Sequence, residues 1–518
     1  MTFSWLKRLM AFALMGMVSA VGAQPAAPAV TFQKQTLQGS YSEKQPTVAV
    51  FKGVPYARPP VGQLRWQAPK PTVVRSGIQQ ATQWPAACYQ NNYNLVWYQE
   101  IATAFGSNEL GFSNPTFSED CLYLNIWSAS LKKQAKLPVI VWIHGGSNKA
   151  GWSFEPNYHG DQLAAQGAVV VSVGYRLGIF GFFGHPELRG SQRPTNFGLL
   201  DQIAALHWVR EHIADFGGDA DNVTIAGESA GGADVSYLLA SPLAAGLFHR
   251  AISESGGYLL RDARTLADAE LIGSKLSAAR PDKPNLAALR LLSSEEIFKT
   301  AKQSLAHEQY GPVSDGVSVL VPTTLHYRIH GIGVDLLIGS NENEDYMYVD
   351  DNPATLAATL AGLPSESREP LEKRALLEPT TKHANDRIEA LVEMHCPAYV
   401  MAQSAGSHGH QAFVYRFTRV RPGPGGQALL AYHGAEIPYV FNTQDVWLPT
   451  TADDAVLTDA MVHYWSNFAR SGNPNGNGKP LWVPFTVDHP TVQELGVHIG
   501  GIAGPDYALC HQIESVLY

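Results

Sequence analysis

Four short, continuous apolar runs in the chain have the length and composition of strands that are buried on both faces. They are Val139–Ile143, Ala168–Val173, Val223–Ala226 and Leu336–Ile338. Strands of a parallel sheet show this pattern because helices cover both faces of the sheet. Between the second and third runs, apolar residues at 199, 203, 206, 209, 213 and 216 recur at helical spacing, and Gly217-Gly218 end the segment. The alternation predicts an α/β fold with a mainly parallel central sheet flanked by helices.

Two other regions, around 262–310 and 354–405, have helical patterns and lack strong strand runs. We expect them to form helical cap insertions over the sheet edge. No internal repeat, low-complexity tract or clear linker divides the chain. Residues 24–518 are therefore expected to form a single domain.

Residues 1–23 have the pattern of a secretory signal peptide. Lys7 and Arg8 form a basic start, Leu9–Val21 is mostly apolar, and Val21-Gly22-Ala23 provides a small-residue cleavage site. A membrane anchor is the alternative, but the apolar stretch is short, and no other segment approaches about 18 apolar residues. We expect export after cleavage, to the periplasm or outside the cell, with no stable membrane anchor.

Charge and cysteine content narrow the choice of partners and cofactors. The chain has 37 basic and 46 acidic residues, and removal of Lys7 and Arg8 leaves 35 against 46, a net charge of −11. Nucleic acid and anionic membranes bind basic patches, so neither is an expected partner. The sequence leaves the oligomeric state open. The four cysteines include no CxxC pair, and we expect no metal site.

The same four cysteines suggest disulfides. An even number of cysteines in an exported chain suggests two bridges, for which the sequence allows three pairings. We favour Cys88–Cys121 and Cys396–Cys510, because these pairings do not cross.

Residues 222–232, NVTIAGESAGG, contain a candidate nucleophile. The G-x-S-x-G pattern of 227–231 follows a short strand and precedes the helix-like stretch ADVSYLLA, and this strand–turn–helix context gives the motif its meaning. Flanking glycines let a tight turn expose Ser229. A chance match in an ordinary turn is the alternative, and the context favours the nucleophile.

A serine nucleophile needs a base and an acid that orients the base, in the chain order Ser, acid, His for such a fold. The segment LLIGSNENED (336–345) ends a predicted strand in a polar loop and offers Glu342, Glu344 and Asp345. His433 lies in a later loop. A structural histidine and exposed loop charges are the alternatives, and the pattern alone does not choose among the three acids.

Seven segments resemble, in order, the type-B carboxylesterase/cholinesterase family of α/β-hydrolases. They are FKGVPYARPPVGQLRW (51–66), EDCLYLNIW (119–127), VVVSVGYRLGIFGF (169–182), NFGLLDQIAALHWVREHIADFGGDADNVTIAGESAGG (196–232), RAISESGG (250–257), HGAEIPYVF (433–441) and MVHYWSNFARSGNPN (461–475). The resemblance covers nearly the whole chain after residue 23. It implies an α/β-hydrolase fold and a serine carboxylesterase that hydrolyses small esters through an acyl-enzyme without a cofactor.

The resemblance also implies residue roles. Ser229 would be the nucleophile, His433 the base and Glu344 the acid. It implies the Cys88–Cys121 bridge and makes Cys396–Cys510 plausible by position. IHGG (143–146) is similar to the family's oxyanion-hole strand end, which implies backbone donors at Gly146, Ser147 and Ala230. Ser147 stands where the family has a third glycine, so a side chain lies beside the expected position of the acyl carbon.

Two rival functions and one specificity hypothesis follow. A non-catalytic adhesion protein of the same fold would typically lack a triad member, and all three are present. A cholinesterase would place a Trp about ten residues before Cys121. Residues 110–120, LGFSNPTFSED, contain no Trp, so choline esters are not expected substrates. Lys149 follows the oxyanion-hole segment in an acidic chain, so we hypothesise that it faces the substrate and favours esters that carry a carboxylate. A lysine that reaches solvent from a loop is the alternative.

Overall fold

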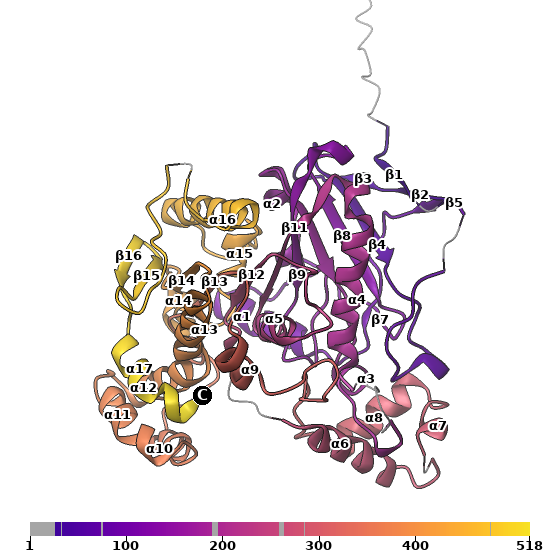
Figure 1. The fold of residues 1–518 in the computed structure, drawn as a ribbon. Helices are drawn as coiled ribbons and strands as arrows, with labels where there is room; N and C mark the ends of the chain where they lie inside the picture. Colours follow the sequence, from indigo (N-terminus) through magenta and orange to yellow (C-terminus); the bar gives the residue numbers. More distant parts are fainter. Residues whose placement is uncertain are drawn as a thin grey trace, which may run out of the picture.

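The computed structural model describes residues 26–518, except 33, 74–75, 189–194, 258–263, 284 and 477. The predicted signal peptide, residues 1–23, lies outside the described residues. The fold is built on an 11-stranded sheet in the order β16-β15-β14-β13-β12-β11-β9-β10-β8-β4-β3 (Figure 1). Its strands are β3 (Ser40–Tyr41), β4 (Ala49–Pro55), β8 (Tyr123–Ser128), β9 (Leu137–Ile143), β10 (Val169–Val173), β11 (Gly218–Glu228), β12 (Arg250–Glu254), β13 (Asp335–Asn341), β14 (Ala412–Phe417), β15 (Thr491–Leu495) and β16 (Ile499–Ala503).

The seven neighbouring strands from β15 to β10 are parallel. Antiparallel strands β8, β4 and β3 extend one edge, and β16 extends the other. All four apolar runs are strands of the parallel part, so this prediction is confirmed. Smaller sheets pair β1 (Ala29–Phe32), β2 (Gln35–Gln38) and β5 (Gly77–Gln80), and β6 (Ala87–Cys88) with β7 (Phe117–Ser118).

The sheet separates two apolar cores, and successive side chains of β9 enter them alternately. Val139, Val141 and Ile143 pack into one core, whereas Ile140 and Trp142 pack into the other. Helix α4 (Phe197–His212) contributes to the first core and α16 (Ala452–Ser471) to the second. A strand covered on both faces has no reason to alternate with polar residues, which explains its continuous apolar run.

The predicted helix at 199–216 is also present. It is α4 followed by a 3₁₀ turn, Ile213–Phe216, and Gly217 ends it with a left-handed φ of 84°. The other helices are α1 (Tyr93–Ala104), α2 (Asp161–Ala165), α3 (Gly178–Gly181), α5 (Ala230–Ala240), α9 (Thr323–His330), α14 (Pro424–Leu429), α15 (Ile437–Val440) and α17 (Tyr507–Leu517).

The two regions expected to form helical caps are helical, and most of their helices lie in two groups in the lower part of Figure 1. They are α6 (Leu266–Ala278), α7 (Leu286–Leu289) and α8 (Ser294–Ser304), and α10 (Pro353–Ala361), α11 (Ser365–Ala375), α12 (Thr381–Ala390) and α13 (Cys396–Ser407). Helix α13 departs from the prediction, because it packs against β13 and β14 and not in an edge cap. Its Met401 and Ala402 are fully buried, and this burial holds the helix against the sheet.

Two disulfides are present, Cys88–Cys121 and Cys396–Cys510. The first closes a loop that contains α1, and the second joins α13 to α17. No helix in the described part of the chain is both long enough and apolar enough to cross a membrane.

Candidate active site

Ser229 occupies the sharp turn between β11 and α5. Its φ of 55° and ψ of −125° are unusual for a residue with a side chain, and such strain costs about 1–3 kcal/mol. Glycines make the turn possible. A Cβ on Gly227 would lie 2.5 Å from the carbonyl carbon of Gly231, and a Cβ on Gly231 would lie 2.0 Å from the carbonyl oxygen of Ile143. The pattern G-x-S-x-G thus presses the turn against β9 and leaves the Ser229 hydroxyl at the end of the sheet.

His433 lies between Ser229 and Glu344. Its Nε2 is 2.8 Å from Ser229 Oγ, and its Nδ1 is 2.6 Å from Glu344 Oε2. The three residues come from separate loops, after β11, after β13 and before α15. The structure therefore brings together three side chains that are far apart in sequence.

Of the three candidate acids, Glu344 is the one that meets His433. Glu342 instead pairs with Arg387 and with Arg416, the latter at 2.9 Å. Burial alone would raise the pKa of Glu342. The two guanidinium groups outweigh this effect and lower the pKa to about 2. Asp345 lines the cavity beside the site, and its backbone N–H donates to Asp386. Only the folded structure shows which of the three acids contacts His433, because successive residues of the loop point their side chains in different directions.

Glu344 is held by two further donors. The Ser255 hydroxyl and the Asn341 backbone N–H each donate to Glu344 Oε1 at 2.6 Å. Oε1 is occupied in this way, and Oε2 is left for His433. Ser255 has a left-handed φ of 49° and follows β12, within the segment RAISESGG. Sequence reasoning did not identify it, although a serine at a parallel strand end is a detectable signal.

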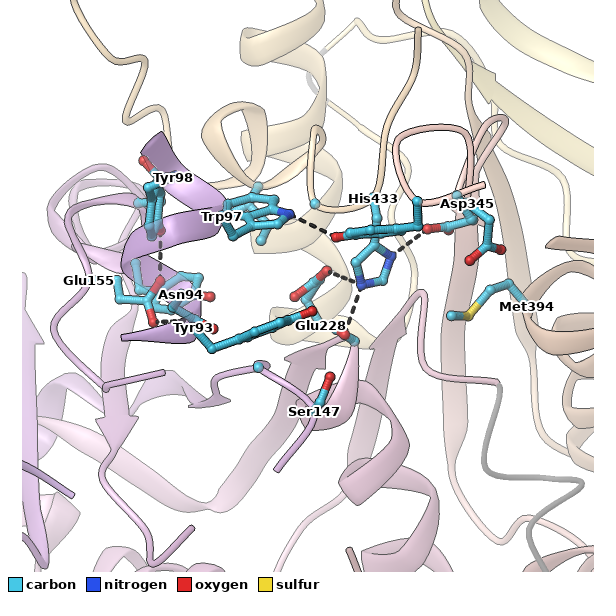
Figure 2. Close-up of a pocket in the computed structure, with 18 of the residues that line it drawn as sticks. Tyr93, Asn94, Trp97, Tyr98, Ser147, Glu155, Glu228, Asp345, Met394 and His433 are labelled. Carbon is cyan, nitrogen blue, oxygen red and sulfur yellow. Dashed lines mark hydrogen bonds and ion pairs between the residues drawn. The ribbon is translucent and has the colours of Figure 1, made fainter. Parts of the chain in front are cut away.

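The Ser229 hydroxyl and His433 open into a cavity of about 310 Å³ (Figure 2). Gly146 and Ser147, two expected oxyanion donors, line it. Ala230, the third, is the first residue of α5, where the backbone N–H has no acceptor within the helix. Gly145 brings this loop close to Ser229, because a Cβ there would lie 2.9 Å from Ser229 Cβ. Ser147 keeps the left-handed conformation that glycine prefers, with φ of 56°.

The cavity is acidic and aromatic. Its carboxylates are Glu155, Glu228, Glu344, Asp345 and Glu393, and its aromatic residues are Tyr93, Trp97, Tyr98, Tyr158 and Tyr348. Within the described residues, no lysine or arginine lines it. Glu228 Oε1 lies 3.3 Å from His433 Nε2. Burial lowers the pKa of His433, but the negative charges of Glu228 and Glu344 raise it more, so the net shift is upward.

Comparisons with known proteins identify the family of the chain. The sequence model of the Carboxylesterase family matches residues 26–502. The chain belongs to the carboxylesterase family. It is 34% identical to a liver carboxylesterase of Sus scrofa, over 95% of this chain and 94% of that protein. It is 36% identical to a para-nitrobenzyl esterase of Bacillus subtilis, over 82% of this chain and 86% of that protein. A solved PNB esterase structure superposes with a TM-score of 0.78 at 31% identity, covering 95% of this chain and 99% of that one.

This carboxylesterase is therefore a carboxylic ester hydrolase with an α/β-hydrolase fold, and the non-catalytic alternative is not favoured. The predictions of the family, the fold and the enzyme class are confirmed.

The residues after the oxyanion segment are tied to the neighbouring helix. Asn148 is buried, and its Nδ2 donates to Asp234 Oδ1 on α5 at 3.1 Å. The loop is thus tied to the helix that follows Ser229.

Lys149 does not reach the cavity of this carboxylesterase. Its Nζ donates to Gln309 Oε1 at 3.3 Å and lies 5.9 Å from the ring centroid of Tyr310. It is half-buried on the outer side of the loop, and it is not among the described residues that line the cavity. This placement fits the alternative of a lysine that reaches solvent. Asn148 is buried whereas Lys149 beside it is only half-buried, and the sequence alone did not show which of the two points inward.

The wall formed by α1 was also missed in the sequence. Buried Glu155 accepts hydrogen bonds from the Tyr98 hydroxyl at 2.7 Å, Asn94 Nδ2 at 3.1 Å and the Trp152 backbone N–H at 2.9 Å. These bonds fix the inner face of α1 against the cavity. A carboxylate in an apolar, aromatic segment, as in GWSFEP (151–156), was the available signal.

Proposed function

We propose that the chain is an exported serine carboxylesterase that acts through an acyl-enzyme on Ser229. The observation that carries this proposal is the continuous hydrogen-bonded series Glu344–His433–Ser229, which ends in the cavity beside Gly146 and Ser147. Residues 24–518 would act as a single domain after cleavage of residues 1–23. The two disulfides and the absence of a spanning helix in the described residues are compatible with export.

In the first half-reaction, Ser229 Oγ attacks the ester carbonyl carbon, and its proton passes to His433 Nε2. The carbonyl oxygen becomes an oxyanion, which accepts hydrogen bonds from the N–H groups of Gly146, Ser147 and Ala230. The bond between carbon and the alcohol oxygen then breaks, and His433 Nε2 gives its proton to the leaving alkoxide. The acyl group remains as an ester of Ser229.

In the second half-reaction, His433 removes a proton from water, and the hydroxide attacks the acyl carbon. The bond to Ser229 Oγ breaks, Oγ recovers the proton from His433, and the carboxylic acid leaves. Glu344 accepts from His433 Nδ1 throughout, so it fixes the tautomer with Nε2 toward Ser229 and stabilises the imidazolium. Each step uses only groups of this chain, the ester and water.

The substrate class is a small, uncharged ester. The lining is aromatic and, among the described residues, contains no lysine or arginine. This supports neutral esters, because the carboxylate of a charged ester would lose its hydration without gaining a cationic partner. The hypothesis that Lys149 recruits anionic esters is not carried into the proposal, because Lys149 lies away from this lining.

The test is covalent labelling with diethyl p-nitrophenyl phosphate, followed by mass spectrometry of the labelled peptide. We expect one equivalent of p-nitrophenol per chain and a diethylphosphoryl group on Ser229. Ser229→Ala should show neither the burst nor the label, and should lose at least about 10⁴-fold in kcat. A label on another residue, or normal turnover by the variant, would contradict the proposal.

A further inference from the structure

Two aromatic side chains from separate segments that line the cavity are joined by a hydrogen bond. Trp97 lies on α1, and Tyr348 lies in the loop after β13 that also carries Glu344. Trp97 Nε1 donates to the Tyr348 hydroxyl at 2.8 Å, and both residues line the cavity. The pair thus bridges segments that are 251 residues apart in sequence.

Both ends of this bridge are anchored. Tyr348 lies in a turn, and its backbone N–H donates to the carbonyl oxygen of Asp345 at 2.8 Å. Trp97 packs edge-on against Tyr98, with ring centroids 5.0 Å apart, and Tyr98 is fixed by its bond to Glu155. Tyr348 is 49% exposed, so the bridge lies at the mouth of the cavity and not in the core.

The position of Trp97 relates the bridge to one half of the ester. A Cβ on Gly434 would lie 3.3 Å from Trp97 Cη2, so the indole packs beside the residue that follows His433. In Figure 2, Trp97 and His433 lie together at one side of the cavity, and Ser147 lies at the other. The leaving alcohol must face His433 Nε2 to receive its proton, whereas the carbonyl oxygen faces the oxyanion loop. Trp97 is therefore on the alcohol side.

We propose that Trp97 and Tyr348 form a hydrogen-bonded aromatic roof over the alcohol side of the cavity, which limits the size of the alcohol group of the ester. The inference rests on the proposed function, in which His433 protonates the leaving alcohol. In this proposal the acyl chain lies outside the roof. Selectivity for the alcohol and selectivity for the acyl chain are then set by different residues.

The experiment measures kcat/KM for two ester series. The alcohol series is ethyl, benzyl and 1-naphthylmethyl acetate, and the acyl series is ethyl acetate, butyrate and octanoate. Trp97→Ala should raise the naphthylmethyl-to-ethyl ratio by roughly tenfold or more, since steric exclusion is relieved, and leave the octanoate-to-acetate ratio unchanged. Tyr348→Phe keeps the ring and removes the hydroxyl, and Trp97→Phe replaces the indole by a smaller ring. Both remove the hydrogen bond, and each should move the alcohol ratio in the same direction by less.

The control is Val96→Ala, on the same helix. Val96 is 54% exposed and is not among the residues that line the cavity, so both ratios should stay at the wild-type values. Each ratio is taken within one variant, and differences in the amount of active enzyme cancel. If a Trp97→Ala protein does not fold, Trp97→Phe and Tyr348→Phe still decide the question.

Three results would overturn the roof. They are an unchanged alcohol ratio in Trp97→Ala, an equal change in the acyl ratio, and no change in both phenylalanine variants. Labelling of Ser229 by diethyl p-nitrophenyl phosphate distinguishes these three results from a failure of the proposed function. Wild-type protein labelled at Ser229 with unchanged ratios refutes the roof alone, whereas protein without that label refutes the mechanism on which it rests.

Discussion

Glu228 places a carboxylate oxygen 3.3 Å from His433 Nε2, the ring nitrogen that also faces Ser229. Glu228 is buried, and this burial raises its pKa, while the positive charge of His433 lowers it. The two groups therefore compete for a proton at the site of the chemistry. A neighbouring carboxylate stabilises the imidazolium that forms in the transition state, but it also favours a protonated, inactive His433 in the resting enzyme.

Glu228→Gln should move the acid limb of the pH profile of kcat/KM to lower pH. The substitution removes a negative charge that raises the pKa of His433, and a base with a lower pKa becomes neutral at lower pH. At the plateau, kcat should fall by roughly tenfold, about 1.4 kcal/mol, because the imidazolium loses a stabilising charge. The control is Glu155→Gln, which should keep the wild-type limb. A limb that stays in place in Glu228→Gln would show that Glu228 does not set this pKa.

Glu344→Gln should be crippling, whereas Glu342→Gln and Asp345→Asn should be mild in kcat. An amide at 344 does not stabilise the imidazolium and can hold the wrong tautomer, which costs about 10⁴-fold in kcat in such triads. Glu342→Gln leaves Arg387 and Arg416 beside a neutral partner, so its main effect should be a lower Tm. Active sites are counted by titration with diethyl p-nitrophenyl phosphate. The rate per active site then separates a loss of catalysis from a loss of folded protein. Were Asp345→Asn the inactive variant, the acid would be misassigned by one residue.

The sequence predicted features that depend on local pattern. β9 and β11 read as buried strands because both faces are covered, and G-x-S-x-G marks a turn that only glycines permit. The local pattern could not choose among Glu342, Glu344 and Asp345, and only the family resemblance pointed to Glu344. In the structure, arginines of α12 and β14 pair with Glu342 and hold it away from His433. The direction of Lys149 could likewise not be predicted. It depends on a distant partner of its neighbour, because the hydrogen bond to Asp234 holds Asn148 on the inner side of the loop.

Neutral esters should be hydrolysed faster than analogues that carry a carboxylate. Among the described residues, no lysine or arginine lines the cavity, so a carboxylate on the ester loses its hydration there without gaining a cationic partner. The measurement compares kcat/KM for diethyl succinate and monoethyl succinate at a pH where the latter is ionised. We expect the anion to be slower by roughly tenfold or more, and Lys149→Met to leave the ratio unchanged. A faster anionic ester, slowed selectively by Lys149→Met, would restore a role for that lysine.

The two disulfides should differ in what their loss does. Cys396–Cys510 closes the longer loop, with a sequence separation of 114, and joins α13 to α17. The loop-closure model then predicts that Cys396→Ser/Cys510→Ser loses about 5 kcal/mol of unfolding free energy. Neither cysteine lines the cavity, so kcat/KM per active site should stay at the wild-type value below the Tm.

Cys88–Cys121 has a sequence separation of 33, and its loss should cost less, about 4 kcal/mol in the same model. Its loop contains α1, which contributes Tyr93, Asn94, Trp97 and Tyr98 to the cavity wall. Cys88→Ser/Cys121→Ser should therefore raise KM and change the ratio of rates on large and small alcohol esters, although it destabilises less. Urea unfolding and kcat/KM on the two double variants give both quantities. The prediction is wrong if stability and activity fall in the same order.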